Sequence, residues 1–129
     1  ETVLLMIAER APLFIIMKIY VGKKSTSLDE RKSWEEAVEY CEDLTLGGRD
    51  DWRLPEASEL SQIVLERTGE VSVDENYFSD TTPSHYWTNT EYEMRDGFHW
   101  YIHFEVGYQG FSPDFNEYPV RCVRDISLF

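Results

Sequence analysis

Two stretches of this chain decide its fold: Asp51-Trp52-Arg53-Leu54-Pro55 near the middle and Val120-Arg121-Cys122-Val123-Arg124 near the end. The first lies between two predicted helices. We expect the Trp52 indole to fill the core and the five N–H donors of Arg53 to tie loop carbonyl groups. A binding site built from Trp52 and Arg53 is the alternative interpretation.

The first helix is predicted over residues 34–45. Ser33 and Glu36 have the spacing of a capping box, in which each side chain satisfies a backbone donor of the first turn. Gly47-Gly48 should end the helix, because glycine enters the left-handed region without steric cost. The apolar face at helical spacing consists of Ala37, Tyr40, Cys41 and Leu44.

The second helix is predicted over residues 56–68. It should start near Pro55, where a missing N–H costs nothing, and stop at Gly69. Its buried stripe is expected to contain Leu60, Ile63, Val64 and the stem of Arg67.

Strands are predicted at both ends of the chain. Residues 13–21 are β-branched and aromatic between Pro12 and Gly22, as in a buried strand. The pattern of residues 1–12 supports no assignment beyond an edge strand. Residues 99–106 alternate as in a strand with one face in the core and one in water. The inward set is Trp100, Ile102, Phe104 and Val106, and the outward set is His99, Tyr101, His103 and Glu105.

Three further motifs accompany the two stretches: Trp34-x-x-Ala37-x-x-Tyr40-Cys41, Glu59-Leu60 and Tyr86-Trp87-Thr88-Asn89-Thr90. In this order and spacing, the chain over about residues 33–124 resembles the C-terminal domain family of the Legionella collagen-like protein, a branch of the C-type lectin-like fold. The resemblance implies a binding module, and it implies a disulfide between Cys41 and Cys122; two buried thiols in a reducing compartment are the alternative. It also implies that the strand near 13–21 pairs with the strand carrying Val120 to Arg124.

The fold class that follows is α+β and C-type lectin-like, with two helices around a small antiparallel sheet and adjacent N- and C-terminal strands. Residues 1–129 form a single ligand-binding domain, a length that can bury one core. The longest apolar run near the start, Ala11 to Met17, is too short for a transmembrane helix or a clear signal peptide. We expect an extracellular, cell-surface or virion-surface location, and the apolar N-terminal strand leaves self-association open.

The net charge of −13 argues against nucleic acid, anionic membranes and sulfated polysaccharides as partners, because a polyanion would be repelled. We also predict no membrane insertion, since no apolar run is long enough to span a bilayer. Sulfated glycans are nonetheless the ligands that the family resemblance implies for the namesake adhesin. Residues 29–80 hold 16 acidic and 5 basic residues, so much of the charge lies in the helical half, where a solvated face is its simplest interpretation.

The sequence predicts no cofactor and no metal site. His99 and His103 lie about 13 Å apart along a strand, too far to chelate one ion. The triplets through which many C-type lectins hold calcium, Glu-Pro-Asn and Gln-Pro-Asp, are absent. Formylglycine-generating enzymes share the wider fold, but the resemblance places their reactive cysteines elsewhere, and no nucleophile elbow or phosphate loop is present. We therefore predict no enzyme, with a relative of those enzymes as the weakest alternative.

The C-terminal third is rich in aromatic residues, with 11 of the 19 between Tyr86 and Tyr118. Tyrosine among Ser, Gly, Asn and Asp is the composition of antibody paratopes. We expect a protein ligand, with a glycan as the second candidate in a carbohydrate-binding adhesin. The predicted ligand-binding residues are Tyr92, Arg95, Phe98, His99, Tyr101, His103, Glu105, Tyr108, Phe111, Asp114 and Phe115.

This segment also resembles the variable region of diversity-generating retroelement proteins. Adenine mutagenesis of AAC or AAT codons yields Asn, Tyr, Asp, His, Ser, Gly and Phe among its products, and these seven types make up 18 of the 30 residues in 89–118. Such a protein would display a hypervariable surface. A plain aromatic binding face explains the same enrichment.

Overall fold

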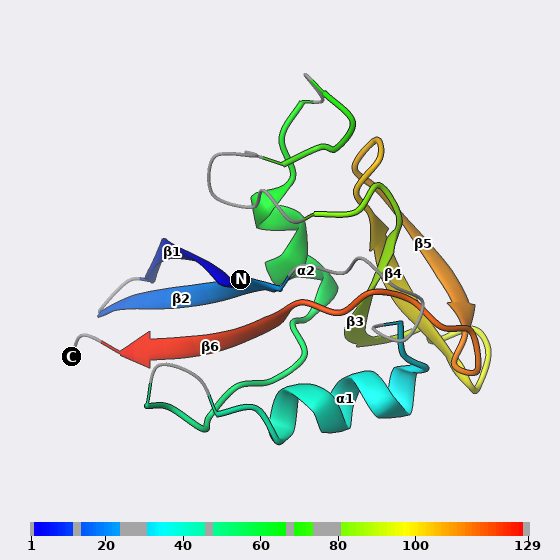
Figure 1. The fold of residues 1–129 in the computed structure, drawn as a ribbon, viewed down its shortest axis with the longest axis horizontal. Helices are drawn as coiled ribbons and strands as arrows, with labels where there is room; N and C mark the ends of the chain where they lie inside the picture. Colours follow the sequence, from blue (N-terminus) through cyan, green and yellow to red (C-terminus); the bar gives the residue numbers. More distant parts are fainter. Residues whose placement is uncertain are drawn as a thin grey trace.

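The computed structural model describes residues 2–11, 14–23, 31–45, 48–66, 69–73 and 81–127, with side chains from residue 31 to residue 125. Its helices and strands form an α+β fold with two three-stranded antiparallel sheets, of orders β1-β2-β6 and β3-β4-β5 (Figure 1). The elements are β1 (Thr2–Ala11), β2 (Phe14–Lys23), α1 (Trp34–Glu42), α2 (Ala57–Leu60), the 3-10 turn η2 (Ser61–Ile63), β3 (His85–Glu91), β4 (Phe98–His103), β5 (Tyr108–Pro113) and β6 (Cys122–Ser127).

The first sheet confirms the predicted pairing of the terminal strands. β2 lies antiparallel to β6, with Val21 opposite Cys122 and Tyr20 opposite Val123. β1 pairs with the other side of β2 and forms the edge of the sheet, as residues 1–12 allowed. Arg53 extends this arrangement by exchanging backbone hydrogen bonds of 2.9 Å with Val123.

Helix α1 begins as predicted. The Ser33 hydroxyl accepts from the Glu36 N–H, and the Glu36 carboxylate accepts from the Ser33 N–H at 3.0 Å. That backbone hydrogen bond is the main reason why the pKa of Glu36 is lowered. The helix ends at Glu42, three residues before the predicted end, with Asp43 as its C-cap. Gly48, at φ 74°, therefore belongs to the following turn, and Gly47 lies outside the described residues.

The second helix is shorter than predicted. Glu56 caps α2, so the helix starts one residue later than expected, and it tightens into η2 before ending at Ile63. The Ser61 hydroxyl donates to the Ser58 carbonyl at 3.0 Å, a side-chain bond that competes with helical continuation. Leu65 then donates its N–H to the Ser72 carbonyl at 2.7 Å, which draws the chain out of the helix. The predicted contribution of Arg67 lies outside the described residues.

Two buried clusters cover opposite faces of β3 and β4, where Tyr86 is opposite Ile102 and Trp87 is opposite Tyr101. One cluster packs under α2 and η2 and contains Leu60, Ile63, Val71, Val73, Tyr86, Ile102, Phe104 and Val123. The other packs against α1 and contains Ala37, Cys41, Trp52, Leu54, Trp87 and Cys122.

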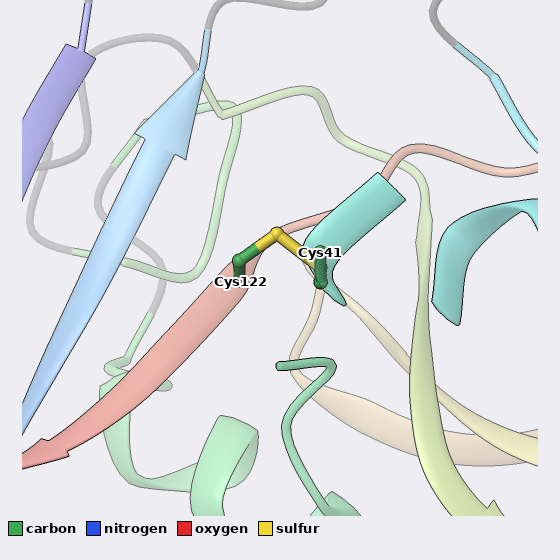
Figure 2. The surroundings of a disulfide bond; sticks show 2 residues. All are labelled: Cys41 and Cys122. Carbon is green, nitrogen blue, oxygen red and sulfur yellow. A yellow bond between two sulfur atoms is a disulfide. The ribbon is translucent and has the colours of Figure 1, made fainter. Parts of the chain in front are cut away.

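A disulfide joins Cys41 on α1 to Cys122 on β6, with the two Cα atoms 5.5 Å apart (Figure 2). The bridge that the family resemblance implied is thus confirmed. It ties the second buried cluster to the sheet that carries both terminal strands. Trp52 packs beside it, only 4% exposed, as predicted.

Arg53 differs from its prediction. Its guanidinium donates to carboxylates instead of loop carbonyl groups: to Glu59 at 2.7 and 2.6 Å and to Asp125 at 3.1 Å. Glu59 is 5% exposed, so the buried carboxylate receives the paired charge that burial demands. Arg53 therefore clamps α2 to β6.

Candidate functional site

Four aromatic rings gather on one face of the β3-β4-β5 sheet, beyond the end of its buried core. We call Tyr92, Phe98, Trp100 and Phe111 the Trp100 cluster. Tyr92 and Phe111 stack with ring centroids 4.0 Å apart, and Trp100 meets them edge-on at 5.3 and 5.8 Å. Phe98 completes the group, 6.2 Å from Phe111.

The strand register explains why these rings meet. Trp100 lies opposite Phe111 in the β4–β5 pair, so their side chains share one face of the sheet. The N–H of Tyr92 donates to the Phe98 carbonyl at 3.0 Å, which closes the β3–β4 connection and brings the Tyr92 ring onto the same face. Gly97 turns this connection at φ 79°, a conformation that side chains rarely adopt.

The Trp100 cluster is only partly covered. Phe111 is 46% exposed, and Tyr92, Phe98 and Trp100 are half-buried. Two further apolar side chains at this end of the sheet are almost fully exposed: Met94 at 82% and Phe115 at 79%. Exposed apolar side chains gathered in this way are typical of a binding surface.

The charge around the Trp100 cluster is acidic. Residues 89–118 contain six carboxylates and one cationic side chain, Arg95. The Arg95 guanidinium lies 4.6 Å from the centre of the Phe98 ring, in a cation–π contact. Exposed carboxylates of Glu91, Glu93 and Asp96 flank it along the chain.

A second aromatic group, which we call the His85 group, occupies the opposite face and contains His85, Tyr101, His103, Tyr108 and Tyr118. His85 stacks on Tyr118 at 4.6 Å and meets His103 and Tyr101 edge-on, each at 4.4 Å. His103 stacks in turn on Tyr108 at 5.1 Å. These contacts tie the sheet to the segment that leads into β6.

Burial shifts the pKa of two residues in the His85 group, His85 and Tyr101. It lowers the pKa of His85 to about 4, with smaller contributions from His103 and Arg31. Burial also raises the pKa of Tyr101. The Tyr101 ring lies so close to Gly110 that a Cβ on Gly110 would collide with it. Because the pKa of His85 is lowered and that of Tyr101 is raised, both side chains are neutral at pH 7.

His99 is buried, 8% exposed, and the prediction that it faces solvent is wrong. Its ring stacks on Trp34 of α1 at 3.7 Å, and its Nδ1 lies 2.7 Å from an Asp114 carboxylate oxygen. The helix covers this end of the sheet, which strand periodicity alone does not reveal. The His99–Asp114 pair holds β4 and β5 against α1.

The predicted inward set is confirmed for Ile102 and Phe104, which are fully buried, but not for the other two residues. Trp100 is half-buried in the Trp100 cluster. Val106 is 58% exposed, because β4 ends at His103 and the chain turns through residues 104–107.

The eleven predicted site residues therefore separate into groups. The structure brings four together on one face: Tyr92, Arg95, Phe98 and Phe111. Tyr101, His103 and Tyr108 lie on the other face, and His99 and Asp114 bond to each other. Glu105 and Phe115 are exposed in turns beyond the ends of β4 and β5.

Sequence reasoning missed Trp100 and Met94. Trp100 was placed in the core because its strand alternates, although the core ends before the strand does. Met94 offered a signal, since it is an apolar residue inside the polar run from Glu91 to Asp96.

Partly exposed rings next to a loop with exposed carboxylates can bind cationic, aromatic or planar groups of a partner. Within the described ranges, no three His, Cys, Asp or Glu side chains are placed to hold a metal ion. No helix in this part of the chain is long and apolar enough to cross a membrane.

Comparison with known proteins agrees with this architecture. A model of the Lcl C-terminal domain family matches residues 18–124. The chain belongs to this family. The match spans β2 to β6, and so includes the disulfide and both aromatic groups. No curated protein matches this member of the Lcl C-terminal domain family.

Proposed function

We propose that this Lcl C-terminal domain is a non-enzymatic recognition module of the C-type lectin-like type, which binds a protein ligand through the Trp100 cluster. The main observation behind this proposal is that apolar side chains are buried in one part of the β3-β4-β5 sheet and exposed in another. Tyr86, Ile102 and Phe104 are fully buried, whereas Phe111 and Met94 on the same sheet and its loop are exposed. Burying exposed rings is a large source of binding free energy, and rigid rings lose little entropy on binding.

The acidic charge of the domain supports a protein over an acidic glycan. Approach of a sulfated chain to a domain of net charge −13 is opposed by long-range repulsion. A protein can supply complementary cationic and aromatic side chains. A neutral glycan that stacks on Trp100 or Phe111 is the alternative outcome of the test below.

The disulfide supports a location outside the reducing cytosol, since such bonds persist in oxidising compartments. We place the domain at an extracellular, cell or virion surface. This location would expose the Trp100 cluster to partners on other cells or particles.

The test is binding of the labelled domain to an array of purified proteins and an array of defined glycans. A double variant, Tyr92→Ala with Phe111→Ala, removes the stacked pair, and the control Leu65→Ala with Val106→Ala removes two exposed apolar side chains elsewhere. We expect the wild-type domain to bind a protein on the array. The Tyr92→Ala, Phe111→Ala variant should lose about 1 kcal/mol or more of binding free energy per ring, and the control variant should bind as tightly as the wild type. Binding only to glycans, or equal binding by both variants, contradicts the proposal.

Hypervariability of this surface is a refinement of the same proposal. Tyr92, Phe98 and Phe111 are residue types that adenine mutagenesis yields, whereas Trp100 and Met94 would be fixed positions of the template. The refinement predicts a near-copy of the coding sequence for residues 89–118 beside a reverse transcriptase gene. A genome without that copy overturns the refinement and leaves the recognition proposal standing.

A further inference from the structure

Strand β5 is the outer edge of the β3-β4-β5 sheet, and within the described residues it pairs with β4 alone (Figure 1). Edge strands of soluble proteins are usually protected by charges, bulges or a covering element. β5 has the sequence Tyr-Gln-Gly-Phe-Ser-Pro and carries no charged residue; Pro113 restricts only its last position. Its Tyr108, Gln109 and Phe111 side chains are exposed.

The hydrogen-bond pattern shows which backbone groups of β5 face outward. In an antiparallel pair, residues that exchange hydrogen bonds alternate with residues that do not. Asp114 donates its N–H to the Gly97 carbonyl at 2.9 Å, which fixes the phase of the β4–β5 pair. By this alternation, Gly110 and Ser112 bond inward to β4, and the N–H and C=O groups of Gln109 and Phe111 point away from the sheet.

The two outward-facing residues also have their side chains on the face of the Trp100 cluster, because Phe111 is opposite Trp100 and Gln109 is opposite Ile102. An added antiparallel strand would therefore place the residues that bond to Gln109 and Phe111 on that same face. Their side chains would meet the Tyr92 and Phe111 rings.

Charge determines which side chains suit this position. Of the seven fully charged side chains in residues 89–118, six are carboxylates, and the single arginine already lies over Phe98. A cationic side chain beside Phe111 gains cation–π contacts with the rings and attraction from the carboxylates. An acidic side chain in the same place is repelled.

We propose that β5 binds an extended, basic segment of a protein partner by antiparallel strand addition, with alternate Lys or Arg side chains on the Trp100 cluster. This inference rests on the proposed function and specifies its partner. Main-chain hydrogen bonds to Gln109 and Phe111 supply affinity, and the rings and carboxylates select the alternating cations.

The probe is a capped eight-residue peptide that alternates Thr and Arg, measured by fluorescence anisotropy at physiological salt. One analogue carries N-methyl groups on the Arg residues and another on the Thr residues, so both keep composition and charge. When the Arg side chains lie on the Trp100 cluster, the Arg N–H groups point toward β5 and the Thr N–H groups point away from it. Only N-methylation of Arg therefore removes the hydrogen bonds to β5. We expect it to weaken binding about tenfold or more, and Thr N-methylation to leave binding within about twofold. A peptide with Glu in place of Arg should not bind.

Two measurements on the protein complement the peptides. The Gln109→Pro variant loses one outward N–H and should bind about tenfold more weakly than Gln109→Ala, which keeps it. In hydrogen exchange followed by NMR, the amides of Gly110 and Ser112 should be protected in the domain alone. The amides of Gln109 and Phe111 should become protected only with the Thr/Arg peptide bound.

Equal affinity of the two N-methylated peptides, absence of binding by the Thr/Arg peptide, or unprotected Gln109 and Phe111 amides in the complex each overturn strand addition. If the peptide still binds and Tyr92→Ala abolishes binding, the aromatic surface survives as the recognition site without the added strand. If Tyr92→Ala and Phe111→Ala both leave peptide binding intact, this peptide does not use the proposed surface, and strand addition there fails.

Discussion

The two aromatic regions of the β3-β4-β5 sheet use the same residue types for different purposes. Trp87 is fully buried beside the disulfide, and its indole N–H donates to the Lys32 carbonyl at 2.9 Å. Trp100, on the neighbouring strand, is half-buried among rings that face solvent. The difference comes from what covers each Trp ring. The residues of α1 and Tyr118, before β6, pack against Trp87, whereas the rings that contact Trp100 are those of Tyr92 and Phe111, and Phe111 is itself exposed. Burial by other elements, and not residue type, separates the scaffold from the candidate surface.

The largest effect should come from Trp87→Ala. Removing the indole leaves a cavity in a close-packed cluster and takes one hydrogen-bond donor from the Lys32 carbonyl. The free energy of unfolding, measured in urea, should therefore fall by about 3–5 kcal/mol. Trp100→Ala, the matched variant in the exposed region, should cost about 1–2 kcal/mol because part of its surface is already in water. Equal losses would contradict the distinction between the two regions.

The next largest effect should come from removing the disulfide with Cys41→Ala and Cys122→Ala together. The bridge closes a loop with a sequence separation of 81 residues. Its loss should lower the free energy of unfolding by about 2–4 kcal/mol, measured in urea against the oxidised protein. Amide chemical shifts of residues 92–98 should stay unchanged in the folded variant, and large shifts there would show that the two regions are coupled.

His85 should make stability depend on pH. Its folded-state pKa of about 4 lies below the ordinary value of 6.5, so the unfolded chain takes up this proton first. The stability that neutral His85 contributes is fully present above pH 6.5 and is lost as pH falls toward 4. His85→Gln should therefore flatten the decline in Tm across this window relative to the wild type. An identical decline in both proteins would mean that the pKa of His85 is not lowered in the folded protein.

The smallest effect on folding should come from Phe111→Ala. The ring is 46% exposed, and its main contact is the stacked Tyr92 pair, worth about 0.5–1.5 kcal/mol. We expect urea unfolding to change by about 1 kcal/mol, with Leu65→Ala as the exposed control. A loss of about 3 kcal/mol or more would place Phe111 in the core.

Local signals predicted the start of the first helix, which depends on the Ser33–Glu36 capping box, and the burial of Trp52. The long-range pairing of β2 with β6 was predicted through the family resemblance. The end of the second helix could not be predicted in the same way, because the Leu65–Ser72 hydrogen bond that draws the chain out of it joins residues of two different segments.

The candidate site was predictable in composition but not in arrangement. The aromatic enrichment located the segment, and four of the predicted residues do meet on one face. Period-two alternation placed His99 outward and Trp100 inward, yet α1 covers His99 through Trp34, and Trp100 remains half-buried. Which face of a strand is buried depends on elements that pack against it from elsewhere in the chain.

The most direct test of the difference between the Trp100 cluster and the buried core compares two libraries displayed on yeast. One randomises Tyr92, Arg95, Phe98 and Phe111, and the other randomises Tyr86, Trp87, Ile102 and Phe104. The measurement is the fraction of each library that resists protease on the cell surface. We predict that most members of the first library stay folded and that almost none of the second do. A first library as protease-sensitive as the second would contradict the claim that the Trp100 cluster is a surface for recognition and not part of the scaffold.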